Sequence, residues 1–426
     1  MSVTRQMSME PPPLRLLAIQ TSSELTPEAR VLLSLLRALP AAAAWRGAPV
    51  EVLLIQGVDR WAGAKEGYGG AAHFRALPGV CVNVVNVGKL GRAGTAGFAR
   101  AMKVRDLLSL RLARGRLLAA ARRFQPDIVY SAQQLWDLRL ATPLARALGR
   151  PQVVHLHYTV GPWLGRDTLP ILRRADMVIG ISSFIRDDAI RHGVPAERTR
   201  LLYNSIVAPE LPPSRDAAKS ALRTDFGLPD DALVVGMVAR LFENKGQVEL
   251  LRAMLPILRR DRRVHLLLVG SEYPKPHGLT ERLTETARAS GVLPQVHLPG
   301  YRGDVPRILD GLDVFAHPSR SEPFSLAILE AMAHELPGVA WREGGPAEII
   351  VDGQTGILVA PMDIDGLTGA LDGLLGDGAR RVALGKAGRE RALETFNPVI
   401  AGDGFLDALR QVKDKSDSDN RERITR

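Results

Sequence analysis

Two acidic side chains in the second half of the chain have the spacing and the surroundings of a ligand site. Glu322 comes just before a predicted helix, and Glu330 lies eight residues later, two turns along that helix and close to the same face. Backbone N–H groups at the helix start, from Phe324 to Ala327, can hold an anion, while a neighbouring carboxylate can bind hydroxyl groups. A carboxylate pair is also typical of the acid/base couple of a hydrolase. The structural alternative is that Glu322 caps the helix and Glu330 lies on the surface.

Two further loops carry basic or flexible residues where a predicted strand ends. Arg240 and Lys245 lie in the segment 240–246 (RLFENKG), between a strand and a helix start, where two cations and free N–H groups can bind a phosphate. A solvated loop that contains a lysine is the alternative, because charged loops are common. The segment 342–348 (REGGPAE) follows another strand, and its glycines allow backbone to approach a ligand closely. Because such loops meet at one edge of a doubly wound sheet, the sequence predicts one ligand site there.

Short apolar runs alternate with helix-period segments along most of the chain, which is the pattern of a parallel sheet flanked by helices. In the first half, strands are predicted over residues 14–19, 50–55, 80–87, 127–130, 152–157 and 177–181. The pattern stops at the Pro-rich segment 209–214 (PELPPS) and then restarts, with strands over 233–238, 264–269, 296–298, 314–317, 338–341 and 349–350. Predicted helices include 27–39, 247–258, 326–334, 367–375 and 380–394. The predicted fold class is α/β, with two Rossmann-like doubly wound domains that face each other across a cleft.

The domain boundaries follow from these changes in pattern. We predict a flexible leader over 1–13, an N-terminal Rossmann-like domain over 14–208, a linker over 209–215 and a C-terminal Rossmann-like domain over 216–395. Residues 396–412 are expected to form a C-terminal helix that packs back on the N-terminal domain. Residues 413–426 are polar and nearly balanced in charge, so a disordered tail is expected there.

Composition excludes several classes of protein. The chain has 426 residues, 46% of them hydrophobic, which supports a large core and excludes a disordered or collagen-like chain. Cys81 is the single cysteine, so no internal disulfide and no multi-cysteine metal site can form, and a reducing compartment fits best. The first 13 residues lack the apolar core of a secretory signal, and no run approaches the roughly 20 apolar residues of a transmembrane helix. We therefore expect a soluble protein, or one attached to a membrane surface.

Most of the excess positive charge lies in one segment. Between Lys89 and Arg123, ten Lys and Arg residues face Asp106 alone, so this segment carries +9 of the chain's formal +10. The structural interpretation is a helix with a solvated basic face. Of the functional interpretations, adhesion to anionic lipid is preferred, and nucleic acid is disfavoured because no aromatic stacking residues are interleaved.

The second half resembles the donor domain of the family-four retaining glycosyltransferases, which have the GT-B fold. Matching stretches within 234–371 include GMVARLFENKG, HLLLVG, SEPFSLAILEAMAHELPGVAWREGGPAEII and VDGQTGILVAPMDIDGLTGAL. The first half matches more loosely, through ADMVIGISSFIRDDAIRHGVP and LLYNSI. The resemblance implies an N-terminal acceptor domain and a C-terminal domain for the nucleotide sugar.

The resemblance also implies roles for single residues. Arg240 and Lys245 match the basic pair that holds the nucleotide diphosphate, Glu330 matches the glutamate that binds the ribose, and Glu322 faces the donor sugar near the reacting carbon. His157 resembles the histidine that the acceptor domain places at the sugar. The remaining donor contacts would come from backbone around Phe324, Ser325 and Leu326 for sugar and phosphate, and from Gly300, Tyr301 and Arg302 for the base.

As a whole, the resemblance implies a hexosyltransferase that moves a sugar from a UDP- or GDP-sugar to a glycan or lipid-linked acceptor in polysaccharide or glycolipid synthesis. It implies no metal and no other cofactor, a cytoplasmic location and no nucleic-acid partner, with Lys89–Arg123 as a candidate contact to the inner membrane face. Two departures stand out: residues 20–24 (QTSSE) lack the glycine-rich loop usual after the first strand, and Ser325 replaces a usual glycine. A catalytically idle GT-B binding protein, a phosphorylase and an epimerase stay open as alternatives.

Overall fold

The computed structural model describes residues 12–21, 26–46, 49–58, 69–86, 115–132, 135–161, 168–272 and 276–425. Contacts within the chain divide it into two compact units. The first unit comprises Met1–Ser205 and Pro398–Arg426, and the second comprises Ile206–Asn397. Most of the basic segment Lys89–Arg123 lies outside the described residues, which include only its end from residue 115.

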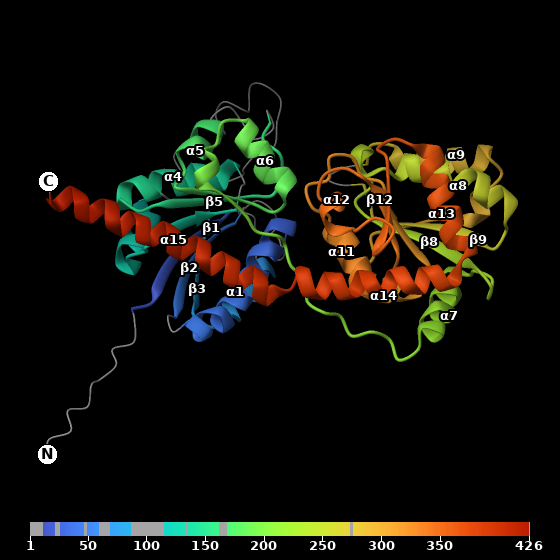
Figure 1. The fold of residues 1–426 in the computed structure, drawn as a ribbon, viewed down its shortest axis with the longest axis horizontal. Coiled ribbons are helices and arrows are strands. Elements are labelled where there is room, and N and C mark those ends of the chain that lie inside the picture. The colour runs from blue at the N-terminus through green and yellow to red at the C-terminus, as the bar shows by residue number, and fades with distance from the viewer. Residues whose placement is uncertain are drawn as a thin grey trace, which may run out of the picture. The chain divides into compact units, whose positions relative to one another are not determined.

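The first unit is built on a seven-stranded sheet in the order β3-β2-β1-β4-β5-β6-β7, in which all neighbouring strands are parallel (Figure 1). The order reverses between β1 and β4, as in a doubly wound fold. Its strands are β1 (Leu14–Gln20), β2 (Val50–Val58), β3 (Val80–Asn86), β4 (Ile128–Ser131), β5 (Gln152–Leu156), β6 (Met177–Gly180) and β7 (Thr199–Leu201). Its helices are α1 (Pro27–Arg46), α2 (Gly69–Arg75), residues 115–124, α4 (Leu135–Leu148), α5 (Thr168–Arg174), α6 (Ser183–Arg191), the 3-10 helix η2 (Ala196–Arg198) and α15 (Pro398–Thr425).

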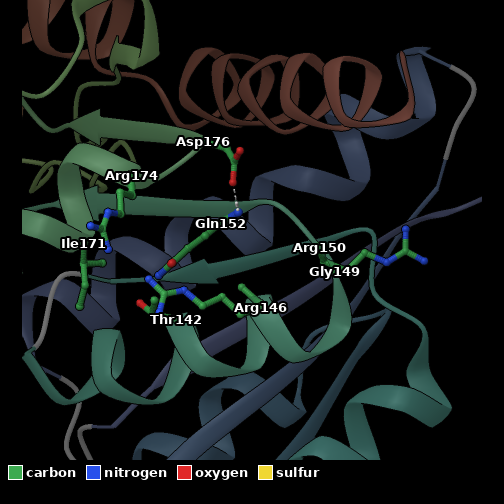
Figure 2. Close-up of a pocket in the computed structure, with 9 residues that line it drawn as sticks. Thr142, Arg146, Gly149, Arg150, Gln152, Ile171, Arg174 and Asp176 are labelled. Carbon is green, nitrogen blue, oxygen red and sulfur yellow. Dashed lines mark hydrogen bonds between the residues drawn. The ribbon is translucent and has the colours of Figure 1, made fainter. Parts of the chain in front are cut away.

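Buried strands of this sheet carry apolar residues on both faces, because helices cover both. Val129 of β4 packs into a cluster that includes Leu117 of the helix over 115–124 and Leu144 of α4. The next residue, Tyr130, points to the opposite face, where its ring lies 5.4 Å from that of Phe405 in α15. Polar contacts align the strand starts as well: the backbone N of Gln152, at the start of β5, donates to the Asp176 carboxylate at 2.8 Å (Figure 2).

The C-terminal helix is longer than the sequence predicts. Residues 413–426, expected as a disordered tail, instead continue α15 as far as Thr425. Lys413 explains part of the difference, because it pairs with Asp417 one turn on at 2.8 Å and lies 3.5 Å from Asp127, which precedes β4. An i, i+4 pair and an ion pair to the unit's body both favour helix in a segment whose composition alone is typical of disorder.

The second unit has a six-stranded sheet, again parallel throughout, in the order β10-β9-β8-β11-β12-β13. This is the doubly wound order, and it reverses between β8 and β11. The strands are β8 (Leu233–Val238), β9 (Val264–Val269), β10 (Val296–Gly300), β11 (Val314–His317), β12 (Gly338–Trp341) and β13 (Gly356–Val359). The helices are α7 (Arg215–Phe226), η3 (Glu243–Lys245), α8 (Gln247–Arg260), α9 (Leu279–Ala289), η4 (Leu293–Gln295), α10 (Val305–Gly311), α11 (Leu326–Ala333), α12 (Pro346–Ile349), α13 (Ile364–Gly376) and α14 (Gly378–Thr395).

One predicted strand of this unit is wrong. Ile349 and Ile350 were expected in a strand, but Ile349 ends the short helix α12, which begins at Pro346. Both isoleucines are buried, and a two-residue apolar run does not distinguish a buried turn of helix from a buried strand. Proline at the first helical position favours the helix. The sixth strand of the sheet is β13 instead.

The linker expected over 209–215 belongs to the second unit. The carbonyl of Pro209 accepts a hydrogen bond from Arg389 of α14 at 3.2 Å, and Ser214 caps α7 through its side chain. Asp363 caps α13 in the same way, accepting from the backbone N of Gly366 at 2.8 Å.

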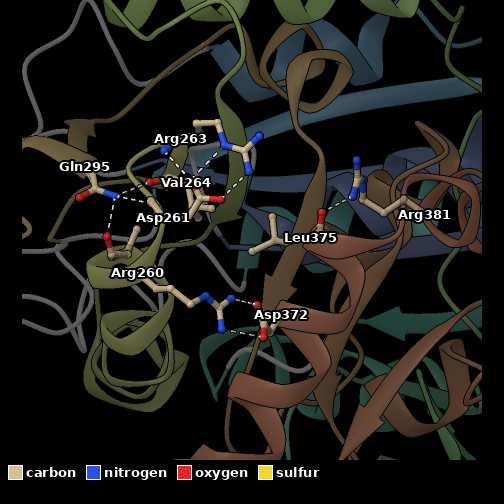
Figure 3. A network of polar contacts seen from close by, with 9 residues as sticks. Arg260, Asp261, Arg263, Val264, Gln295, Asp372, Leu375 and Arg381 are labelled. Carbon is tan, nitrogen blue, oxygen red and sulfur yellow. Dashed lines mark hydrogen bonds and ion pairs between the residues drawn. The ribbon is translucent and has the colours of Figure 1, made fainter.

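Polar contacts fix the amino-terminal edge of the second sheet (Figure 3). Arg260 at the end of α8 pairs with Asp372 of α13, and Arg263 pairs with Asp261 at 2.8 Å. The Gln295 amide donates to three carbonyls, those of Leu258, Asp261 and Val264, at 2.8 to 3.0 Å. These bonds lie at the strand starts, which leaves the opposite edge for loops that can carry chemistry. Within the described residues, no helix is long and apolar enough to cross a membrane.

Candidate active site

Three loops of the second unit meet at the carboxyl ends of β8, β11 and β12, on either side of the point where the strand order reverses. The loop after β8 contacts the loop after β11, because the carbonyl of Asn244 accepts hydrogen bonds from Ser319 Oγ at 3.1 Å and from the backbone N of Arg320 at 2.8 Å. The loop after β12 also joins, through Gly345 N, which donates to the Glu322 carbonyl at 2.8 Å. The convergence that the sequence predicts is therefore present in the structure.

Glycines allow these loops to approach so closely. Gly246 has φ +86°, and a Cβ there would lie 1.9 Å from the Pro318 carbonyl oxygen. A Cβ at Gly344, where φ is +64°, would lie 2.3 Å from the Glu322 carbonyl oxygen, and one at Gly345 would lie 2.2 Å from Phe324 Cα. No side chain fits at such distances, so the glycines set the backbone positions on which the site depends.

Three neighbouring side chains hold the Glu322 carboxylate in place. Its side chain is 9% exposed, and its Oε2 atom lies 2.7 Å from Lys245 Nζ, 2.7 Å from Ser319 Oγ and 3.4 Å from His317 Nε2. Burial alone would raise the pKa of the Glu322 carboxyl, but the hydrogen bond from His317 and the charge of Lys245 outweigh burial and hold that pKa well below its usual range. Glu322 is therefore a charged, immobilised carboxylate at neutral pH.

The start of α11 lies next to this carboxylate in the chain. Ser325, not Glu322, caps the helix, and its Oγ accepts from the backbone N of Ile328 at 3.4 Å, so the capping alternative for Glu322 is wrong. Ser325 has φ +79°, a conformation that favours glycine, which accounts for the glycine usual in the resembling family. Phe324 is buried, with its ring 5.7 Å from that of Phe396. Leu326 is the first residue of α11, and Glu330 is half-buried one turn further along.

The other predicted donor-binding residues lie along the same sheet edge. Arg240 is exposed just after β8, and its carbonyl accepts from the Gln247 side chain at 2.8 Å. Gly300 ends β10, two strands from β8, with φ +77°, and its carbonyl accepts from Gly270 N at 2.9 Å. Tyr301 is 78% exposed. Lys245 and Glu322 are thus in direct contact, whereas Arg240, Gly300 and Tyr301 lie at other positions along the same sheet edge.

His157 belongs to the first unit, where it follows β5 and is 5% exposed. Burial lowers the pKa of its imidazole to about 4, although the nearby Glu28 carboxylate acts in the opposite direction. His157 is therefore neutral at pH 7. Its ring lies 4.6 Å from that of His155, whose Nδ1 is 2.9 Å from the Tyr130 hydroxyl.

The sequence did not predict four polar residues around Glu322 and His157, namely His317, Ser319, Tyr158 and Glu28. His317 and Ser319 hold Glu322, while Tyr158 donates a hydrogen bond to the buried Glu28 carboxylate in the first turn of α1. Burial raises the pKa of Glu28, but hydrogen bonds from Tyr158 and Thr26 outweigh it and leave the pKa lowered. A signal was available for His317 and Tyr158, because each lies at or just after the carboxyl end of a predicted strand. In the described parts of the chain, no three His, Cys, Asp or Glu side chains are grouped to hold a metal ion.

Comparison with known proteins identifies the family. Residues 232–377 match the family model for glycosyl transferases group 1, and residues 29–208 match that for Glycosyltransferase Family 4. The GDP-mannose-dependent alpha-(1-6)-phosphatidylinositol monomannoside mannosyltransferase of Mycolicibacterium smegmatis is 32% identical over 279 residues, which span 61% of this chain and 70% of that protein. The chain belongs to glycosyltransferase family 4. It is a glycosyltransferase of the hexosyltransferase class.

Solved structures place this family 4 glycosyltransferase in the GT-B fold. Anabaena Alr3699/HepE in complex with UDP-glucose superposes with a TM-score of 0.73 at 22% identity, covering 93% of this chain and all of that one. Sucrose-phosphate synthase from Thermosynechococcus elongatus superposes with a TM-score of 0.72 at 21% identity, over 94% of this chain and 99% of that one. The predicted fold class of two doubly wound sheets is confirmed.

Proposed function

We propose that this family 4 glycosyltransferase transfers a sugar from a UDP- or GDP-sugar to a glycan or lipid-linked acceptor, with retention of the anomeric configuration. The proposal rests on one observation above all: a lysine, a buried carboxylate and a helix start meet where the strand order of the second sheet reverses. Ligands of doubly wound sheets bind at that point. Two similar proteins support both nucleotides, since the Mycolicibacterium smegmatis mannosyltransferase depends on GDP-mannose and Anabaena Alr3699/HepE forms a complex with UDP-glucose.

The leaving diphosphate needs positive charge, because negative charge builds up on it as the glycosidic bond breaks. Lys245 and Arg240 supply two cations, and the N–H groups at the start of α11, around Phe324, Ser325 and Leu326, supply a helix dipole. With these groups in place the proposed reaction needs no metal ion. Glu330 would bind the ribose hydroxyls, and the backbone of Gly300 and Tyr301 would contact the base.

Glu322 would face the donor sugar. The three hydrogen-bonding partners that hold it converge on one carboxylate oxygen, Oε2. The depressed pKa keeps the carboxylate charged at neutral pH, so it can stabilise the positive charge of an oxocarbenium-like sugar. His157 would act from the acceptor side as a neutral imidazole, which can both donate and accept a hydrogen bond with sugar hydroxyls.

The donor assignment is tested by thermal shift with UDP, GDP and ADP, because a ligand that binds the folded state raises its melting temperature. We expect UDP or GDP to raise it and ADP not to. The Lys245→Gln variant should lose that shift, while Lys386→Gln, which removes an exposed lysine from α14, should keep it. A shift that is equal in both variants would contradict the role of Lys245.

Turnover is tested with the nucleotide sugar that binds. Transfer should fall by at least about a hundredfold in Glu322→Gln, the loss typical when charge stabilisation of a transition state is removed. It should survive chelation of divalent metals, and the anomer of the product, read by NMR, should match that of the donor. Binding without turnover would favour the idle GT-B alternative, and an inverted product would refute the retaining mechanism.

The membrane part of the proposal concerns Lys89–Arg123 and a lipid-linked acceptor. Basic residues near an anionic surface add roughly 1 kcal/mol each to binding. Co-sedimentation should therefore be stronger with vesicles that contain phosphatidylglycerol than with phosphatidylcholine alone. Equal recovery on both would refute the membrane contact and leave the donor assignment intact.

A further inference from the structure

A small pocket opens at the amino-terminal edge of the first unit's sheet, where α4 and α5 end and β5 begins (Figure 2). Its volume is about 170 Å³. The polar residues that line it are Thr142, Arg146, Arg150, Gln152, Arg174 and Asp176. His157 follows the opposite end of β5, so within this unit the pocket is separate from the residue assigned to the reaction.

The charge of this pocket is positive. Three arginines line it but only one carboxylate, that of Asp176, whose Oδ2 accepts a hydrogen bond from the Gln152 backbone. Among the described residues, no ion pair or hydrogen bond engages the side chains of Arg146, Arg150 or Arg174. The adjacent Arg173 differs, because its guanidinium donates twice to the His192 carbonyl at 2.8 and 3.0 Å and so has a structural role.

Two buried polar atoms at the pocket have no partner in the described structure. Gln152 is 6% exposed and its Nε2 makes no hydrogen bond, and Thr142 is 9% exposed and its Oγ1 makes none. Figure 2 shows the Arg146 side chain extending toward the Gln152 amide and Thr142, while Arg150 extends away from them. Buried polar groups are nearly always hydrogen-bonded, so these two groups are available to a ligand that enters the pocket.

Helix dipoles account for only part of this arrangement. Arg146 and Arg174 lie in the last turns of α4 and α5, where a positive charge is favourable in any case. A helix dipole gives no reason, however, for the unpartnered amide and hydroxyl of Gln152 and Thr142 beside them. A ligand that accepts several hydrogen bonds accounts for Arg146, Arg174 and these two groups together.

We propose that this pocket binds a phosphate group. The guanidinium fork matches the oxygens of phosphate, and Gln152 and Thr142 supply two further donors. A volume of about 170 Å³ is well below the ~300 Å³ at which pockets for drug-sized ligands begin, so it suits a phosphate group and excludes a whole nucleotide sugar. The group can belong to free inorganic phosphate or to the headgroup of a phospholipid, and the experiment below separates these sources.

The first experiment uses the full chain and maps binding by residue. Phenylglyoxal modifies accessible arginines, and peptide mass spectrometry measures the rate at each site with and without inorganic phosphate. Phosphate should slow modification of Arg146 and Arg174 and leave Arg75, exposed at the end of α2, unchanged. This readout is independent of sugar transfer and of phosphate bound near Arg240. Equal rates at Arg146 and Arg174 with and without phosphate, together with no selective headgroup binding in the second experiment, would overturn the proposal.

The second experiment compares the double variant Arg146→Gln/Arg174→Gln with the charge-matched control Arg37→Gln/Arg75→Gln, which removes two exposed arginines of α1 and α2. Calorimetric affinity for inorganic phosphate should fall roughly tenfold or more in the pocket variant, the loss expected for hydrogen bonds to a charged group, and should be unchanged in the control. If a lipid headgroup is the source, the pocket variant alone should lose binding to vesicles that contain phosphatidic acid. If both variants lose affinity equally, net charge is responsible and the pocket is not a site.

Discussion

Removal of the Lys245 ammonium should destabilise the second unit, because it leaves the Glu322 carboxylate buried with fewer partners. In Lys245→Met the stem length is kept and the charge is lost. Breaking a buried ion pair by removing one partner typically costs 3–5 kcal/mol. Lys245 is 20% exposed, and Ser319 and His317 still hold Glu322, so we expect the lower end of this range, about 3 kcal/mol at pH 7.

A double-mutant cycle isolates the pair. Lys245→Met, Glu322→Gln and the double variant are compared by hydrogen exchange of peptides from β11 and α11, which reports the free energy of local opening. The double variant should cost at least about 1 kcal/mol less than the sum of the single variants, because it leaves no unpaired charge. Additive costs would refute the claim that the Lys245 charge stabilises the Glu322 carboxylate.

The pH dependence gives the same prediction an independent check. The folded state lowers the pKa of Glu322, so the stability that the ionised group contributes is present above the ordinary glutamate pKa of about 4.3 and is lost as pH falls through the folded value. The cost of Lys245→Met should therefore shrink when the exchange experiment is repeated below pH 4. A cost that is constant from pH 7 to pH 3 would show that packing, not charge, is responsible.

Three further variants test other parts of the structure. Gly345→Ala should lower the melting temperature by several degrees, because its Cβ would lie 2.2 Å from Phe324 Cα, whereas Gly369→Ala in α13, which meets open space, should not. Tyr158→Phe should reduce the free energy of unfolding of the first unit by about 1–3 kcal/mol in urea, because it removes a donor to buried Glu28; a change in the second unit alone would contradict this. Burial and the neighbouring His265 lower the pKa of His297 to about 4. Solvent screening of this partly exposed ring reduces the full effect, so the second unit should lose about 2 kcal/mol of stability as pH falls from 6.5 to 4. His297→Gln should make the melting temperature fall less over the same pH range.

The pattern of apolar residues predicted the strands that are buried along their whole length. It failed where contacts between distant residues determine the secondary structure. The strands 233–238, 264–269, 314–317 and 338–341 have the predicted bounds, because strands covered on both faces are mostly apolar. The polar residues 413–425 form a helix in part because Asp127, a partner far away in sequence, pairs with Lys413.

The candidate site was predictable to a similar degree. Strand-end loops located Lys245 and Glu322 at one edge of the sheet, but their direct contact depends on the Gly246 and Gly344 backbones lying within van der Waals reach of the neighbouring loop. No sequence spacing encodes such a distance. The same limit applies to Ser319, whose hydroxyl links two loops through Asn244 and Glu322.

The ion pair between Lys245 and Glu322 implies that, in the proposed donor site, Lys245 binds the diphosphate before the full charge of Glu322 acts on the sugar. A diphosphate carries more charge than one carboxylate, so on binding it would compete with Glu322 for the Lys245 ammonium. Glu322 would then keep the hydrogen bonds from Ser319 and His317 but lose the cation that partly neutralises it. Its negative charge would act more strongly on the sugar at the moment the donor is in place. In the proposed reaction, one lysine therefore binds the leaving group and makes the carboxylate available to the developing positive charge.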